Sequence, residues 1–257
     1  MEPHSQQRMA NAMIAQTAAK MRAHLNEFSG RLSAGLCKPA QRFVAEALYG
    51  IAARGSVHLS EIGRALEETV PLAKTETRLS RNLGREALRG HVGGAVLREG
   101  STRIGKRTLL VLDLSDIAKP YAEKMEYLAR VRDGSSGEIA DGYWLCQVIG
   151  VENEATAITP LYSALYSQKA PDFQSENEEI KTAISKVSAA CGKRGVWVID
   201  RGGDRGELYA PLLAAEHVFI IRNTGRRNVL AGRDKLGTAE LAARCPMIYA
   251  THVVREE

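Results

Sequence analysis

The fold class can be inferred outward from the segment Gly195-Val-Trp-Val-Ile-Asp200-Arg-Gly-Gly-Asp204-Arg-Gly-Glu207. Its residues 196 to 199 are β-branched or aromatic, which predicts a short buried strand. Asp200 stands where this strand runs out into glycines, a favourable place for a carboxylate that binds a metal ion. Asp204 and Glu207 have the Asp-x-x-Glu spacing of a capping box, so we expect a helix to begin here, with a late start or a kink caused by Pro211.

A second apolar run, Thr108-Leu-Leu-Val-Leu-Asp113-Leu-Ser-Asp116, also ends in a carboxylate. Asp113 follows the apolar residues directly, whereas Asp116 lies past them, so Asp113 is favoured as the functional residue. The alternative interpretation of Asp113 is an aspartate that serves only a turn or a cap. The pattern of an apolar strand with a terminal Asp therefore occurs twice.

The segments between and after these runs complete an α/β pattern. Residues 142 to 151 and 155 to 162 are two strand-like runs joined by a polar turn, which predicts a hairpin. Residues 121 to 141 are charged and punctuated by glycine, so we expect an exposed excursion there. An amphipathic pattern predicts a helix over 176 to 191, and a further strand follows at 217 to 222.

Composition indicates an ordinary globular chain with an uneven distribution of charge. The 257 residues are 44% hydrophobic and 25% charged, which excludes a mainly disordered protein. Residues 1 to 106 hold 16 Lys and Arg against 9 Asp and Glu, whereas residues 107 to 257 hold 19 against 21. A basic lobe therefore precedes a nearly neutral lobe that carries the carboxylates.

The cysteines and the apolar runs bear on the compartment. The four cysteines are far apart and lack the spacing of a zinc site or a disulfide framework, so we expect buried thiols in a reducing cytosol. No apolar run approaches the ~20 residues that cross a membrane, and we expect neither a signal peptide nor a membrane partner. The expected location is the cytoplasm.

The sequence of the basic lobe, residues 1 to 106, predicts a series of helices. Helical patterns cover residues 1 to 30, 39 to 55 and 60 to 66, and a further helix is expected from Lys74 to about Leu88 with Leu79 and Leu83 toward the core. Residues 89 to 106 contain five glycines and predict a linker or hairpin, with a domain boundary near residue 104.

The last of these helices has a face suited to DNA. It resembles the second helix of a helix-turn-helix, which lies in the major groove. The alternative is an Arg-rich helix face exposed to solvent, and the basic charge of the lobe favours nucleic acid. The candidate DNA-binding residues on this helix are Lys74, Thr77, Arg78, Arg81 and Arg85.

The order of strands and helices, with one Asp after the first strand and another after the fourth, resembles the ribonuclease-H-like fold. More narrowly, Val-Leu-Asp113-Leu-Ser-Asp116 followed by Lys119-Pro120, then Gly142-Tyr143, then Ile-Asp200-Arg-Gly-Gly-Asp204, look like segments of bacterial DDE-type insertion-sequence transposases. The resemblance implies a mixed sheet with flanking helices over 105–223, an all-α DNA-binding domain over 1–104, and the start of an insertion or a truncated C-terminal region over 224–257. It also implies that the first and fourth strands lie side by side.

The chemistry that the resemblance implies is metal-dependent cleavage and transfer of DNA strands. Asp113 and Asp200 would be the catalytic ligands of Mg²⁺ or Mn²⁺, since hard oxygen ligands suit these ions. The implied partners are double-stranded DNA, as element ends and target, and further copies of the chain assembled on DNA, which would associate it with the nucleoid. Further candidates for holding the DNA backbone, with ordinary surface charge as the alternative, are Arg201, Arg222, Arg226 and Arg227.

One element of the family pattern is not found in this sequence. The family takes a third acid from a later helix with a Tyr-x-x-Arg-x-x-x-Glu pattern, and neither Glu240 nor the Glu256-Glu257 pair has that context. We therefore expect a truncated element whose activity alone is uncertain. The alternatives are a non-catalytic DNA-binding remnant that regulates transposition, and another ribonuclease-H-like nuclease such as a resolvase.

Overall fold

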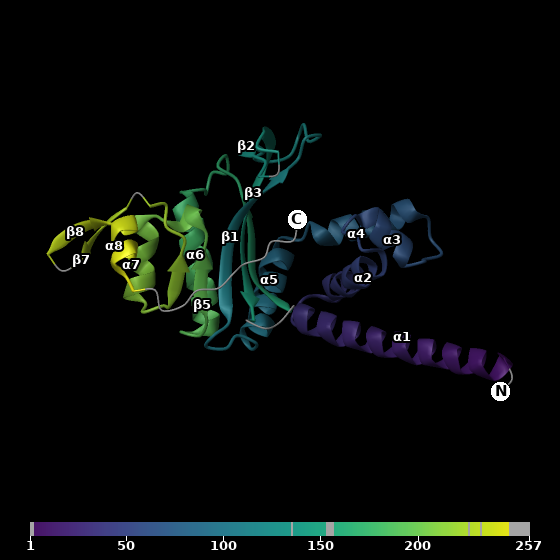
Figure 1. Ribbon diagram of the computed structural model, residues 1–257. Helices are drawn as coiled ribbons and strands as arrows, with labels where there is room; N and C mark the ends of the chain where they lie inside the picture. Colours follow the sequence, from purple (N-terminus) through teal and green to yellow (C-terminus); the bar gives the residue numbers. More distant parts are fainter. Residues whose placement is uncertain (1–2, 135, 153–156, 226, 232, 247–257) are drawn as a thin grey trace. The chain divides into compact units, whose positions relative to one another are not determined.

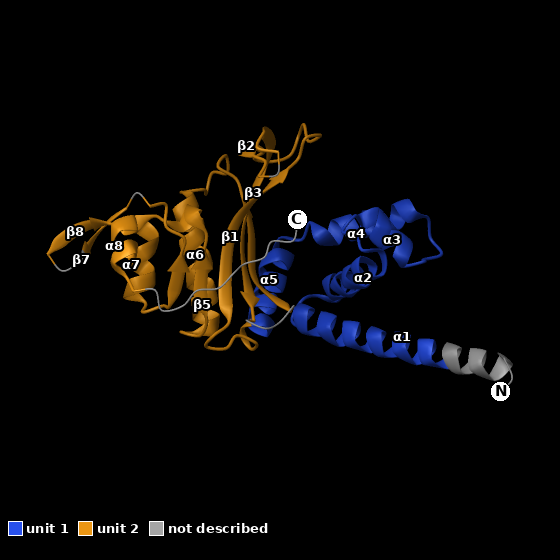
Figure 2. Ribbon diagram, in the orientation of Figure 1, with its two compact units in different colours: residues 1–100 blue, residues 101–257 orange. Residues whose placement is uncertain are grey.

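The protein divides into two compact units, Met1–Gly100 (unit 1) and Ser101–Glu257 (unit 2), coloured separately in Figure 2. The structure is a computed structural model that describes residues 3–134, 136–152, 157–225, 227–231 and 233–246. The sequence had placed the boundary near residue 104. Unit 1 holds 14 Lys and Arg against 9 Asp and Glu, so it carries the whole net charge of +5, while unit 2 holds 21 of each sign.

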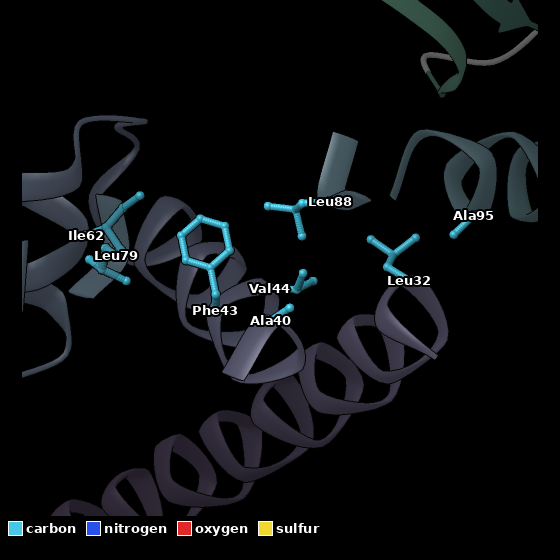
Figure 3. Close-up of a cluster of buried hydrophobic side chains, with 8 residues drawn as sticks. All are labelled: Leu32, Ala40, Phe43, Val44, Ile62, Leu79, Leu88 and Ala95. Atoms are coloured by element: carbon cyan, nitrogen blue, oxygen red, sulfur yellow. The ribbon is translucent and has the colours of Figure 1, made fainter. Parts of the chain in front are cut away.

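Unit 1 is built from five helices: α1 Pro3–Ser33, α2 Lys38–Arg54, α3 Leu59–Ala65, α4 Leu72–Leu83 and α5 Glu86–Ser101. All five contribute to one hydrophobic core (Figure 3), whose buried members are Leu32, Ala40, Phe43, Val44, Ile62, Leu79, Leu88 and Ala95. The all-α character expected of the N-terminal lobe is therefore present.

Two glycines allow the middle helices to approach closely. A Cβ built on Gly50 of α2 would lie 2.6 Å from Cγ2 and 2.8 Å from Cα of Ile62 in α3. A Cβ on Gly63 of α3 would lie 2.9 Å from Cδ1 of Leu72 at the start of α4. Small residues at both contacts therefore set the packing of α2, α3 and α4.

Two sequence expectations in unit 1 are wrong. The glycine-containing segment 89 to 106 is not a linker, because most of it lies in α5, where Leu88 and Ala95 face the core. The burial of these side chains outweighs the cost of glycine in a helix, which is about 1 kcal/mol per residue. Leu83 is 55% exposed, since α4 ends there and its buried face is formed by Thr75, Leu79 and Asn82.

Unit 2 contains a mixed sheet, so the chain is an α/β protein (Figure 1). Its strands are β1 Leu109–Ala118, β2 Ala129–Arg132, β3 Ile139–Val151, β4 Ile158–Tyr166, β5 Val196–Ile199 and β6 Phe219–Ile221. The order is β2-β3-β1-β5-β6, and β4 also pairs with β3. The contacts of β3 with β1, β2 and β4 are antiparallel, whereas β1 pairs parallel with β5 and β5 with β6.

The two faces of this sheet differ. Leu110 and Leu112 of β1, with Trp197 and Ile199 of β5, are almost fully buried on one face. Helix α6, Glu176–Cys191, packs against β3 and β4 and buries the apolar side that its sequence pattern predicted. We call the opposite face of the sheet, which carries the alternate residues Val111, Asp113 and Val198, the open face.

The rest of unit 2 follows β5. A 3-10 turn η1, Arg201–Gly203, leads to α7, Gly206–Ala214, which packs against α6. After β6 come β7 Asn228–Ala231 and β8 Asp234–Gly237, which form a two-stranded antiparallel sheet, and then α8 Thr238–Arg244.

The four cysteines differ in burial, and the expectation of buried thiols is correct for only two of them. Cys146 and Cys191 are buried, Cys37 and Cys245 are exposed, and all four are free thiols. Within the described residues, the helices include none with the length and apolar character that spanning a membrane requires.

Candidate functional site

The carboxyl ends of three neighbouring parallel strands carry charged side chains. The last paired residues of β1 and β5 are Leu112 and Ile199, and Asp113 and Asp200 follow them directly. Ile199 also pairs with Ile221 of β6, which Arg222 follows, and the Arg222 amide donates to the Ile199 carbonyl at 3.1 Å. Since neighbouring strands lie about 4.8 Å apart, the strand pairing brings Asp113, Asp200 and Arg222 side by side.

The expectation that the first strand ends at Asp113 is wrong, and the reason is informative. Strand β1 continues to Ala118 because it stays paired with β3 as far as Gly142. What ends at Leu112 is the pairing with β5, whose chain turns away at Asp200 into η1. Asp113 therefore lies where the sheet loses a strand on one side, which leaves its side chain exposed.

The structure separates Asp113 from Asp116. The two are three residues apart in one strand, so their side chains leave opposite faces of the sheet. Asp116 Oδ1 accepts a hydrogen bond of 2.9 Å from the Gly134 amide, which ties it to the turn after β2. Of the two, Asp113 is the one beside Asp200.

The two carboxylates retain free acceptor capacity. Asp113 Oδ2 accepts from the Ser115 hydroxyl at 3.0 Å, and Asp200 Oδ1 accepts from the Gly202 amide at 2.8 Å, which caps η1. Both side chains are exposed, and each has a second oxygen with no protein donor among the described residues. Two adjacent carboxylates of this kind fit Mg²⁺ or Mn²⁺, which bind through one or two carboxylates and keep several waters.

A third acidic ligand is not identified. Among the described residues, no three His, Cys, Asp or Glu side chains are grouped so that they could hold a metal ion. Glu240 lies in α8 and pairs with Arg244 at 2.6 Å. Glu256 and Glu257 lie outside the described residues.

Cys146, which pairs with Leu114 of β1, lies beneath this site on the buried face. Burial raises the pKa of its thiol to about 12, with further contributions from the negative charges of Glu179, Asp113 and Glu176. The thiol therefore stays protonated at neutral pH. It is neither a nucleophile nor a thiolate ligand for the adjacent site.

Asp204 is not the helix cap that its spacing predicted. Helix α7 begins at Gly206, and its N-cap residue is Arg205. The Asp204 side chain is 1% exposed and accepts from the Thr224 amide and hydroxyl at 2.8 Å each, from Arg227 Nε at 2.7 Å and from the Tyr209 hydroxyl at 3.1 Å. These four donors form a clamp, which we call the Asp204 clamp, between the end of β5 and the segment after β6.

The clamp also determines the electrostatics of Asp204. The hydrogen bond from the Thr224 amide is the largest influence on its pKa, and burial opposes it. The Thr224 hydroxyl, Arg227 and Tyr209 add to the effect of the amide and hold the pKa well below its usual range. Asp204 therefore stays ionised, with its charge satisfied inside the protein.

The arginines expected near the site differ in their surroundings. Arg227 belongs to the Asp204 clamp and lies over the Tyr209 ring at 5.0 Å, so it has a structural role, and its expected contact with DNA stays a prediction. Arg201 lies in η1 and Arg222 directly after β6, and both are exposed. Arg226 lies outside the described residues.

The exposed side of α4 in unit 1 forms a basic groove. Its lining includes Lys74, Thr77, Arg78 and Arg81 of α4, Arg85 just after the helix, and Pro39 of α2. The groove has a volume of about 650 Å³, and a second hollow of about 520 Å³ on the other side of Thr77 and Arg81 is lined by Ser60, Glu76 and Ser80 among others. We call the first hollow the α4 groove.

Arg78 does not belong to the free cations of this helix. Its guanidinium forms ion pairs with Glu46 of α2 and, at 2.9 Å, with Glu68 of the turn between α3 and α4. Thr75 donates to the same Glu68 at 2.7 Å, and this hydrogen bond is the largest influence that lowers the Glu68 pKa. Arg78 therefore ties α4 to its neighbours, while its expected contact with DNA stays a prediction.

Sequence reasoning missed this network because its members are far apart. Glu46 and Glu68 lie 32 and 10 residues before Arg78. The one local signal is the i,i+4 pair of Arg42 and Glu46 on α2, which are 2.6 Å apart. By contrast, Lys74 and Arg81 form no ion pair within the described part of the chain.

Comparison with known proteins identifies no family for this chain. The sequence matches no protein-family model and no curated protein.

Proposed function

We propose that the chain is a DDE-type DNA transposase, in which unit 1 binds the element ends and unit 2 carries a ribonuclease-H-like site for metal-dependent cleavage and transfer of DNA strands. The observation that supports this proposal most strongly is the strand pairing that brings Asp113 and Asp200 together from positions far apart in the sequence.

The topology of unit 2 agrees with a ribonuclease-H-like fold. Three antiparallel strands, β1, β3 and β4, are followed by α6 and then by β5, which returns to lie parallel beside β1. Carboxyl ends of parallel strands are a common location for ligand sites in open α/β sheets. The candidate carboxylates lie at that edge.

Asp113 and Asp200 would hold Mg²⁺ or Mn²⁺ through their free oxygens. When bound, such an ion supplies Lewis-acid stabilisation of the phosphodiester and lowers the pKa of a bound water. Arg222, beside Asp200, is placed to hold a phosphate of the same DNA strand, since a guanidinium fork matches phosphate oxygens. The α4 groove would bind duplex DNA through Lys74 and Arg81, with self-association on DNA as a further part of the proposal.

The test is divalent-metal binding and metal-dependent cleavage by the full chain. We expect Asp113→Asn and Asp200→Asn each to weaken Mn²⁺ binding, followed by electron paramagnetic resonance, and to abolish any cleavage of a duplex that carries the flanking element ends. Asp116→Asn is the matched control, because Asp116 lies on the other face of β1. Equal Mn²⁺ binding by all four proteins would exclude the metal site.

Binding and cleavage separate the proposed enzyme from a non-catalytic regulator. A chain that binds the duplex and Mn²⁺ but leaves the DNA intact would be a DNA-binding remnant. Cleavage of branched DNA without preference for element ends would instead identify a resolvase-like nuclease.

A further inference from the structure

A single row of polar side chains crosses the open face of the sheet in unit 2. Gln147 of β3 pairs with Asp113 on one side and with Ser163 of β4 on the other. Asp200 and Arg222 directly follow the last paired residues of β5 and β6, so the order along the row is Ser163, Gln147, Asp113, Asp200, Arg222. All five side chains are exposed.

The neighbouring row on the same face is apolar. It contains Val111, Val198 and Ile220, which lie two residues before Asp113, Asp200 and Arg222, and Ile149, which follows Gln147 by two residues because β3 runs antiparallel to β1. Ile220 is 59% exposed. The polar row is therefore not simply the outside of a solvated sheet, because the same face turns apolar one step away along the strands.

The outer members of the row have unused hydrogen-bonding groups. The side chains of Ser163, Gln147 and Arg222 make no hydrogen bond or ion pair among the described residues. Two neutral donors thus lie on one side of the carboxylates and a cation lies on the other. Such an arrangement suits a polyanion whose central phosphate meets the carboxylates through a divalent ion and whose neighbouring phosphates meet the donors.

We infer that this row is a binding track for the backbone of one DNA strand, with Gln147 and Ser163 as phosphate-binding residues that no sequence motif revealed. The inference rests on the proposed function, since it names the path of the substrate strand at the same site. Five strands at about 4.8 Å spacing make a track of about 20 Å, long enough for several nucleotides. The adjacent apolar row offers a surface to the bases of that strand.

The first experiment measures binding of a fluorescent 12-nucleotide oligothymidylate to the full chain in Mg²⁺ by fluorescence anisotropy. The background variant Lys74→Ala/Arg81→Ala removes the contribution of the α4 groove. Adding Gln147→Ala and Ser163→Ala should weaken binding about tenfold, the loss expected for two hydrogen bonds to phosphate. The matched control adds Gln174→Ala and Ser185→Ala, which remove the same side chains at exposed positions outside the row.

Equal affinities for the row variant and the control variant would overturn the inference. The proposed function would then still stand if Asp113→Asn alone weakened Mn²⁺ binding. No binding of the oligonucleotide by the background variant would also overturn the track, and the Mn²⁺ titration would again decide the proposed function separately.

A second measurement locates the strand without relying on affinity. A photoreactive benzoylphenylalanine at position 163 should cross-link to the oligonucleotide in Mg²⁺, whereas the same residue at position 185 of α6 should not. Cross-links of equal yield from both positions would contradict a defined track. Near-native circular dichroism of all variants is expected, because every substituted side chain is exposed.

Discussion

Whether a carboxylate in this protein can bind a ligand depends on how many hydrogen-bond donors surround it. Asp113 and Asp200 each receive one hydrogen bond and remain exposed, whereas Asp204 receives four and is buried. The first two can bind a ligand from solvent. The third has no capacity left for one and instead stabilises the segment after β6.

Replacing Asp204 should destabilise unit 2. In Asp204→Asn the amide group replaces one acceptor by a donor, which then faces Thr224 or Arg227 with the wrong polarity. We expect the free energy of unfolding to fall by about 3 kcal/mol. Both tryptophans, Trp144 and Trp197, lie in unit 2, so urea unfolding followed by tryptophan fluorescence measures the effect.

Asp172→Asn is the control for this change, since Asp172 is exposed and has no hydrogen-bond partner among the described residues. It should leave the unfolding midpoint unchanged. A midpoint for Asp204→Asn that equals the control would show that the Asp204 clamp contributes nothing to stability.

The lowered pKa of Asp204 predicts how the stability of the protein depends on pH. The pKa of Asp204 is lowered in the folded protein, while the unfolded carboxyl has a pKa of about 3.9. The stabilisation is therefore fully present above about pH 5 and is lost as pH falls below about 4 toward the folded pKa. The difference in unfolding free energy between wild type and Asp204→Asn should shrink over this range, and a constant difference would contradict the mechanism.

Sequence reasoning at this scale succeeded where the signal was local and did not reveal ion pairs between remote residues. The position of Asp200 after β5 was predicted from four apolar residues, and the structure confirms that strand. Arg78 and Arg227 were interpreted as DNA ligands because each lies among other polar or basic residues. Their acidic partners, Glu46, Glu68 and Asp204, come from other elements, and no spacing pattern links them.

Among the elements, α2 and α3 are held together by a contact that only glycine permits. In Gly50→Ala the new methyl group would lie 2.6 Å from Cγ2 and 2.8 Å from Cα of Ile62, so the two helices must separate. We expect the free energy of unfolding of unit 1 to fall by about 1 to 3 kcal/mol, the usual cost of overpacking. Thermal unfolding followed by circular dichroism at 222 nm measures the change.

Gly30→Ala is the matched control for Gly50→Ala. Gly30 lies in α1, and beyond the adjacent residues and backbone of its own helix no atom lies within 4 Å of the place that a methyl group would take, so alanine should stabilise the helix by up to about 1 kcal/mol. The two substitutions are the same in chemistry and opposite in expected sign. Equal effects of both would show that helix propensity rather than the contact with α3 controls stability.

Helix α4 carries the prediction on duplex DNA. Lys74→Ala with Arg81→Ala should weaken binding and reduce the slope of log K against log salt by about 2, because each phosphate contact contributes about 0.9. The double variant Lys20→Ala/Arg22→Ala removes the same charge from exposed positions of α1 and should change the slope less. Equal slopes for the two variants would mean that net charge, and not the α4 groove, determines binding.

Elements were predictable from sequence when their apolar pattern was regular. Helix α6 spans the residues that its pattern indicated, and the strand order predicted that β1 and β5 would be neighbours. Helix α5 was missed because its glycines resemble a linker, although Leu88 and Ala95 lie seven residues apart on its buried side. This apolar spacing was the local signal for the helix, and the glycines between the two residues obscured it.

For the whole molecule, the division into two compact units predicts separable unfolding. Gly50→Ala should lower the transition of unit 1 without moving the tryptophan transition of unit 2, and Asp204→Asn should do the reverse. Circular dichroism at 222 nm and tryptophan fluorescence, each applied to both variants, test whether the two units unfold separately. A shift of both transitions by either substitution would show that the units unfold as one.

The distribution of thiols has a practical consequence for this molecule. Each unit holds one exposed cysteine, Cys37 in unit 1 and Cys245 in unit 2, while the remaining two are shielded in the interior of unit 2. A maleimide spin label added to the native chain will therefore mark one position in each unit, with no engineered residue. Dipolar distances between these labels, taken with and without duplex DNA, would report whether the two units change their separation when the duplex binds.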